Sequence, residues 1–142
     1  MYRSVIGIDP GKSGATVWFD GETVEFIKHT ETERDIWDFL LASDASSILL
    51  EKVASMPGQG VKSTFAFGQS YGFLRGILIA REISFRTIRA VEWQRKLGCL
   101  SKGDKKVTRA KAQELFPAIK VTHAIADALL IAYHEYHYPE GS

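Results

Sequence analysis

Three acidic residues occupy positions at which a protein would place the ligands of a metal ion. Asp9 ends a short apolar run and precedes a Pro-Gly turn, and Glu51 directly follows another apolar run. Asp127 interrupts an otherwise apolar stretch, residues 124–132. A carboxylate in such surroundings carries a large desolvation cost unless it is paired or bound to a cation. Oxygen ligands that meet at one edge of a sheet suit hard divalent ions, above all Mg²⁺ or Mn²⁺.

A pair of such ions would give the site a specific chemistry. Two divalent ions about 4 Å apart can activate an attacking water and stabilise the leaving oxygen in phosphodiester cleavage. His123 lies four residues before Asp127, so the two side chains share one face of the predicted helix. His123 is therefore a candidate fourth ligand, or a general acid or base beside the metal ions.

Each of these residues also has an ordinary structural explanation. Asp9 with the following Pro-Gly fits a simple turn, and Glu51 fits a surface acid at a strand end. Asp127 fits an acid that stabilises the N-terminal turns of a helix, and His123 fits a residue that only begins that helix. The four together favour a metal site more than any one of them does.

The distribution of charge indicates a surface for a polyanion. The net charge of the chain is only +1. Residues 85–111, however, contain nine Lys or Arg against two acids, a local balance of +7, whereas residues 1–50 contain four Lys or Arg against nine acids. Such a block is a candidate polyphosphate-binding surface, and the alternative is a solvated basic face.

Periodicity and turn signals predict the elements that would position these residues. Five strands are expected, at residues 3–8, 14–19, 23–27, 47–50 and 85–88. Asp20-Gly21 is a strong hairpin signal between the second and third of them. Five helices are expected, at residues 31–41, 63–81, 91–97, 105–116 and 122–136.

This order predicts an α/β fold with a mixed five-stranded sheet, in which three antiparallel strands are followed by alternating helix and strand, flanked by helices. Residues 1–142 are expected to form a single domain with one core. The order is that of the RNase H-like fold, which also underlies actin-type ATPases. Fold alone therefore does not choose a function.

Other features of the sequence narrow the setting. No apolar run approaches the roughly 20 residues that a membrane-spanning helix needs, so no membrane partner is expected. Cys99 is the only cysteine, which excludes an intrachain disulfide and a cysteine-rich zinc site. With no sign of a secretory leader, the protein is expected to be intracellular and cytoplasmic.

Four short motifs occur in order along the chain: Gly7-Ile8-Asp9-Pro10-Gly11, Leu50-Glu51-Lys52-Val53, Gly68-Gln69-Ser70-Tyr71-Gly72 and residues 123–132. Together they resemble the motifs of RuvC-type Holliday junction resolvases, and are most similar to the short, divergent form encoded by bacteriophages or related mobile elements. The resemblance runs from residue 3 to residue 135. Each motif alone is weakly specific, whereas the ordered set is specific.

The resemblance implies a set of metal ligands. In that family, an Asp on the first strand, a Glu at the end of the fourth and acids on the last helix bind two Mg²⁺ ions, for which Mn²⁺ can substitute. These catalytic and metal-binding roles carry over to Asp9, Glu51 and Asp127. Where the family usually has a second Asp on the last helix, this chain has His123 and Ala124. His123 is the only candidate substitute, and related enzymes use a histidine on this helix.

Two further regions of the family have counterparts here. The loop after the catalytic Glu usually carries an aromatic that wedges into the junction, but residues 54–60 carry none, so Met56 is the candidate wedge. The helix that follows resembles the family's dimer helix, which implies a second copy of the chain across a twofold axis. Its expected interface residues are Gly68, Gly72, Gly76 and Tyr71. Close packing of the glycines against the chain's own sheet is the alternative.

The basic block resembles the family's region that contacts the DNA backbone near the scissile phosphate. The expected contacts are Lys102, Lys105, Lys106 and Arg109, which would position the strand without reading bases. The resemblance implies a homodimeric, metal-dependent endonuclease that resolves four-way junctions by paired symmetric nicks and leaves 5′-phosphate and 3′-hydroxyl ends. If it is encoded by a phage, it would act in the host cytoplasm.

Three other functions compete with this one. Residues 7–14 resemble the phosphate loop of actin-type ATPases, but those proteins need two copies of the fold, and 142 residues are too few. A related nuclease that acts on flaps, replication forks or RNA hybrids would use the same residues. A non-catalytic protein that binds branched DNA would have the basic surface and an incomplete set of acids.

Overall fold

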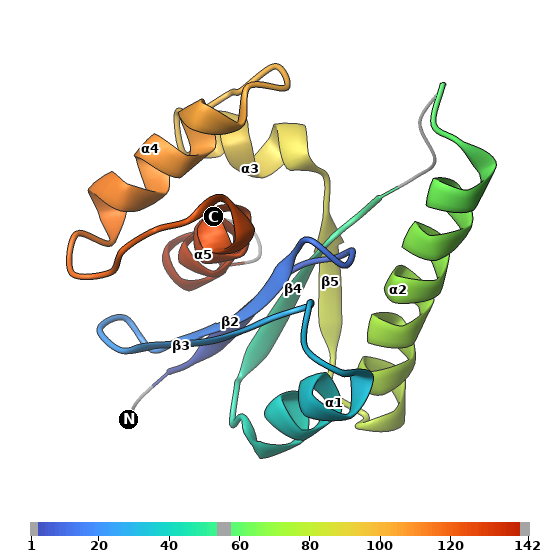
Figure 1. Ribbon diagram of the computed structural model, residues 1–142. Helices are drawn as coiled ribbons and strands as arrows, with labels where there is room; N and C mark the ends of the chain where they lie inside the picture. The colour runs from blue at the N-terminus through green and yellow to red at the C-terminus, as the bar shows by residue number, and fades with distance from the viewer. Residues whose placement is uncertain (1–2, 54–57, 140–142) are drawn as a thin grey trace.

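A five-stranded mixed sheet with helices on both faces forms the framework of the protein (Figure 1). The computed structural model describes residues 3–53 and 58–139. In chain order the elements are β1 (Val5–Asp9), β2 (Ala15–Phe19), β3 (Val24–Lys28), α1 (Glu33–Ala42), β4 (Ser47–Glu51), α2 (Val61–Ala80), β5 (Phe85–Ile88), α3 (Ala90–Lys96), α4 (Lys105–Leu115) and α5 (His123–His137). The predicted order of strands and helices is confirmed.

The strands are arranged in the order β3-β2-β1-β4-β5. β1, β2 and β3 form an antiparallel meander, and β4 is parallel to both β1 and β5. The predicted turn between β2 and β3 is present, with Gly21 at a φ of +98°. The Asp20 carboxylate accepts hydrogen bonds from the backbone N–H of Glu22 and of Thr23, at 2.9 Å and 2.6 Å. These hydrogen bonds stabilise the turn that the Asp20-Gly21 pair predicts.

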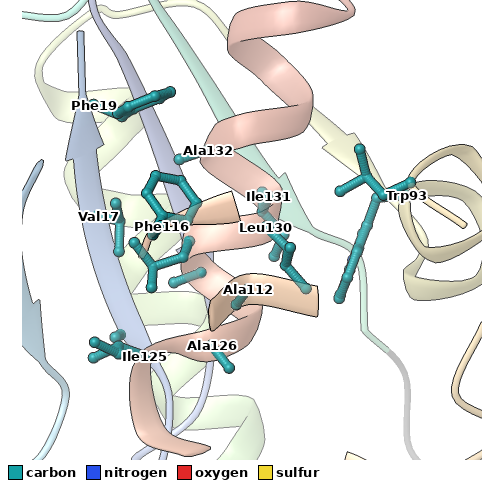
Figure 2. Close-up of a cluster of buried hydrophobic side chains, with 14 of the residues drawn as sticks. Val17, Phe19, Trp93, Ala112, Phe116, Ile125, Ala126, Leu130, Ile131 and Ala132 are labelled. Atoms are coloured by element: carbon teal, nitrogen blue, oxygen red, sulfur yellow. The ribbon is translucent and has the colours of Figure 1, made fainter. Parts of the chain in front are cut away.

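Alternate residues of the central strands supply two hydrophobic clusters, one on each face of the sheet. Val5 and Leu49 belong to the larger cluster, which includes residues of α3, α4 and α5. Figure 2 shows part of this cluster, with side chains of β2, α3, α4 and α5 around the central helix. Ile6 and Ile48 are the sequence neighbours of Val5 and Leu49, and they belong to the second cluster, which also contains residues of α1 and α2.

The last helix, α5, lies against the middle of the sheet, and residues 128–132 are completely buried. Gly7 of β1 permits a close approach of the two backbones. A Cβ atom built on Gly7 would lie 2.3 Å from the backbone nitrogen of Ala132 and 2.8 Å from the carbonyl oxygen of Ala128. Because any side chain at this position would meet helix backbone, the packing of α5 on β1 requires glycine.

Helix α2 is buried only along its C-terminal half, at Leu74, Ile77 and Leu78. It begins two residues earlier than the sequence predicts, with Gly60 as its N-cap. Among the described helices, α2 included, none combines the length and the apolar character that crossing a membrane requires.

Candidate active site

The ends of two neighbouring strands bring Asp9 and Glu51 together. In the parallel ladder between β1 and β4, Ile8 pairs with Leu50, so Asp9 and Glu51 are the next residues of adjacent strands. Gly7 faces α5, and Leu49 belongs to the cluster on the same side of the sheet. Because side chains alternate along a strand, both carboxylates lie on the face that α5 covers.

The first turns of α5 bring Asp127 and His123 to the same place. Asp127 immediately precedes Ala128, whose carbonyl oxygen lies beside Gly7. A cavity of about 160 Å³ at this edge is lined by all four side chains that the sequence predicts as metal ligands. Its other lining residues are Pro10, Ser13, Phe67, Lys105, Thr108 and Ala126. The predicted convergence of distant acids is therefore present in the structure.

The carboxylates of the cavity are poorly solvated, and the charges of Glu51 and Asp127 affect the pKa of their neighbours. Burial, followed by the charges of Glu51 and Asp127, raises the pKa of Asp9 well above its ordinary value, against the opposing effect of Lys105. Burial raises the pKa of Glu51 to about 7. Burial also raises the pKa of Asp127, although a Thr108 hydrogen bond and the charges of Lys105 and His123 lower it. Each acid is thus costly to ionise without a cation.

Two buried side chains from the neighbouring helices hold the carboxylates. The indole N–H of Trp93, on α3, donates a hydrogen bond to Glu51 Oε2 at 2.9 Å. Thr108, on α4, lies close enough to lower the pKa of the Asp127 carboxyl, and its hydroxyl donates a hydrogen bond to the carbonyl oxygen of Lys105 at 3.3 Å. Trp93 is 0% exposed and Thr108 is 4% exposed, so both side chains are fixed by the core. The acids are therefore supported from outside the sheet.

A buried histidine shapes the turn that follows Asp9. His29 lies at the end of β3, with Nδ1 2.9 Å from the carbonyl oxygen of Gly11 and Nε2 2.8 Å from Thr16 Oγ1. Burial lowers the pKa of His29, which favours the neutral ring. Because a carbonyl can only accept, Nδ1 carries the proton and Nε2 accepts from the Thr16 hydroxyl. This bridge holds the turn that carries Ser13 into the cavity.

The donor chemistry of the cavity fits a hard divalent cation. Carboxylate oxygens are the ligands that Mg²⁺ and Mn²⁺ prefer, and an imidazole nitrogen is also acceptable to Mn²⁺. Within residues 3–53 and 58–139, no group of three or more His, Cys, Asp or Glu side chains is already arranged to hold a metal ion. The acids line one cavity, and a cation would have to draw them closer.

The four basic residues predicted to contact DNA differ in their relation to the cavity. Lys105, at the first turn of α4, lines it and lies near enough to lower the pKa of Asp9 and of Asp127. Lys102, Lys106 and Arg109 are exposed on the same helix or the loop before it. The Arg109 Nε–H also donates to the carbonyl oxygen of Val121 at 3.3 Å. Lys105 therefore lies beside the acids, whereas the other three basic residues lie on the exposed surface of α4 and of the loop before it.

The remaining predicted residues lie away from the acids. Met56, the candidate wedge, is outside the described residues. Gly68, Gly72 and Gly76 face open space, because a Cβ atom built on any of them would meet nothing within 4 Å. The alternative of close packing against the chain's own sheet is therefore wrong. Tyr71 is half-buried and packs against the cluster beneath α2.

Three residues that support the site were not predicted from the sequence as part of it, namely Trp93, Thr108 and His29. No local pattern distinguishes Trp93, Thr108 or His29 from other residues of their kind. Along the chain, Trp93 is 42 residues from Glu51, Thr108 is 19 residues from Asp127, and His29 is 18 residues from Gly11. Only the tertiary arrangement reveals such contacts.

Comparison with known proteins gives similarity at the level of the fold. No protein-family model and no curated protein sequence matches the chain. Thermus thermophilus RuvC superposes with a TM-score of 0.67 at 14% identity, over 95% of this chain and 94% of that one. RuvC of the same organism in complex with a Holliday junction substrate gives 0.63 at 13% identity, over 96% and 97%.

A third solved structure comes from a virus. The complex of fowlpox virus resolvase with its substrate Holliday junction DNA gives a TM-score of 0.51 at 15% identity, over 91% of this chain and 95% of that one. All three superpositions span nearly the full length of both proteins. The chain therefore has the RNase H-like fold of RuvC and the poxvirus resolvase, as the order of its elements predicted.

Proposed function

We propose that this protein is a metal-dependent endonuclease that resolves four-way DNA junctions by paired symmetric nicks. The observation that carries the proposal is the convergence of Asp9, Glu51 and Asp127, from three separate elements, on one cavity at the sheet edge. The fold supports the choice of substrate, because two of the solved structures that it resembles contain Holliday junction DNA. Basic residues beside the cavity suit the DNA backbone.

The three acids would hold the cations, with His123 as a fourth ligand or as a general acid or base at the cavity rim. A hard divalent ion, Mg²⁺ or Mn²⁺, would offset the burial that raises the pKa of each carboxylate. When bound, two such ions would supply the charge that phosphodiester cleavage requires. Trp93 would keep Glu51 in position.

The basic residues of α4 would place the DNA strand. Lys105 lies in the cavity and would face the scissile phosphate or its neighbour. Lys102, Lys106 and Arg109 are exposed, so they would contact phosphates farther along the strand. Contacts of this kind fix the register of the backbone and carry no base information, which suits recognition by shape.

An exposed apolar stripe on α2 supports a homodimer. Val61, Phe65 and Ile79 are 88%, 67% and 60% exposed. Together with Gly68, Gly72 and Gly76, they recur at steps of three or four residues and so share one side of the helix. The buried side is formed by Leu74, Ile77 and Leu78.

Two copies joined along this stripe across a twofold axis would each present one site, as paired nicking requires. The glycines would let the two helices approach closely. A role for Tyr71 at the same interface stays a prediction.

A panel of labelled substrates tests the proposed function. We expect the protein with Mg²⁺ or Mn²⁺ to nick a synthetic four-way junction at symmetric positions on opposing strands, and to cut linear duplex poorly. Preferential cleavage of flaps, forks or RNA hybrids would instead identify a related nuclease. Junction binding without cleavage under either metal would identify a non-catalytic binding protein.

A further inference from the structure

The hydrogen bond between Trp93 and Glu51 has the properties of a positioning contact. Trp93 is 0% exposed and belongs to the cluster around α5, so its indole has no freedom to move (Figure 2). Its N–H lies 2.9 Å from Glu51 Oε2. An indole N–H can donate but cannot accept. The contact therefore stabilises the ionised carboxylate and fixes the direction in which it points.

This contact leaves one oxygen of Glu51 available. Within the part of the chain that the structure describes, Oε2 accepts from Trp93 and Oε1 accepts no hydrogen bond. Glu51 also lines the acidic cavity. Burial raises the pKa of Glu51, and the Trp93 hydrogen bond opposes that increase. The indole therefore orients the Glu51 carboxylate and favours its ionised form, and both effects suit a metal ligand that binds through Oε1.

We infer that Trp93 is a positioning residue, which holds Glu51 so that its other carboxylate oxygen can bind a divalent cation. The inference rests on the proposed metal site. Outer hydrogen bonds of this kind orient metal ligands, and their loss typically lowers metal affinity about 10-fold to 100-fold.

Titration with Mn²⁺ alone, followed by electron paramagnetic resonance of the free ion, tests this role without any nuclease assay. Trp93→Phe removes the donor, and we expect about 10-fold weaker Mn²⁺ binding. Trp18→Phe is the matched control, because Trp18 also donates its indole N–H at 2.9 Å, to the carbonyl oxygen of Asp44, and is not among the residues that line the cavity. Its Mn²⁺ affinity should equal that of the wild type.

A double-mutant cycle separates positioning from general damage to the core. If Trp93 acts through Glu51, Trp93→Phe should cost no further affinity in a Glu51→Gln background. A purely structural role would lower the affinity by the same factor in both backgrounds. Should Trp93→Phe fail to fold, incorporation of 3-benzothienylalanine at position 93 preserves the bicyclic shape and removes only the N–H.

The outcomes distinguish this inference from the proposed function. Wild-type affinity in both position-93 variants, or no Mn²⁺ binding by the wild type, would overturn the role of Trp93. Cleavage of a four-way junction is scored separately. If Mn²⁺ affinity falls as expected and yet the wild-type protein never cuts a junction, the proposed function fails and the positioning role stands.

Discussion

The backbone of β1 meets the backbone of α5 at Gly7 and Ala132, where a Cβ atom on Gly7 would lie 2.3 Å from the Ala132 nitrogen. This approach sets the distance between the strand that ends at Asp9 and the helix that carries Asp127. The geometry of the acidic cavity therefore depends on a residue that has no side chain. It also places a strong steric constraint in the centre of the core.

Substitution of Gly7 by alanine should disrupt this packing. The new methyl group would meet helix backbone, which no change of rotamer can relieve, so we expect the free energy of unfolding to fall by about 3 kcal/mol or more. Urea unfolding followed by circular dichroism measures the change. Gly60→Ala is the control, because a Cβ atom built on this N-cap residue of α2 meets nothing within 4 Å, so its stability should change by at most about 1 kcal/mol. Equal stability of the two variants would contradict this packing.

The stability of the metal-free protein should depend on pH through Glu51. Its pKa is raised from 4.5 to about 7, so within that range the folded state binds more protons than the unfolded state does. Stability therefore falls as pH rises through this window, by up to about 3 kcal/mol for Glu51.

Glu51→Gln removes this dependence and should become increasingly more stable than the wild type between about pH 5 and about pH 7.5. Urea unfolding in the presence of EDTA measures the difference at each pH. The buried histidines titrate in both proteins, so the comparison cancels their contribution. A difference that does not change with pH would show that Glu51 is not buried as described.

The basic surface of α4 should contribute to binding through phosphate contacts. Lys106→Ala is expected to weaken junction binding and to reduce the slope of log affinity against log salt by about 1. Fluorescence anisotropy with a catalytically blocked protein at several salt concentrations measures this slope. Arg34→Ala, on α1, removes an exposed charge of the same sign that pairs with Asp38. An unchanged slope in Lys106→Ala, or an equal loss in Arg34→Ala, would exclude α4 as the DNA surface.

The apolar stripe of α2 should hold the dimer together. Phe65→Glu introduces a charge at its exposed aromatic residue, and we expect a monomer in analytical ultracentrifugation, with nicks on the two junction strands no longer coupled. Phe26→Glu provides the control, because Phe26 is 42% exposed on β3, outside α2. A dimer that persists in Phe65→Glu would exclude this stripe as the interface.

The fold could be predicted because its local signals agree with one another. Asp20-Gly21 marks the hairpin, the short apolar run before Glu51 marks a central strand, and the apolar stretch of residues 124–132 marks the last helix. The convergence of the acids followed from the same signals, since strands that end at Asp9 and Glu51 can be neighbours at one edge. The exposed face of α2 did not follow, because glycines at helical spacing fit both a buried and a free surface.

The supporting contacts of the site could not be predicted, for a physical reason. Trp93 reaches Glu51 from a different helix, and their hydrogen bond depends on how α3 packs around α5. His29 likewise reaches Gly11 across the β2–β3 hairpin. Neither residue stands in a local pattern that separates a structural role from a supporting one. Such roles become visible only when donor and acceptor are placed in space.

The most direct test of the whole account is cleavage of a synthetic four-way junction by the wild type, Asp9→Asn and Asp127→Asn in Mg²⁺. The substitutions remove a charge and keep the shape, so both variants should bind the junction nearly as well as the wild type. Asp44→Asn, at an exposed acid outside the cavity, should cut normally. We predict metal-dependent paired nicks by the wild type and none by Asp9→Asn or Asp127→Asn; full cleavage by either variant would contradict the assignment of these acids as the active site.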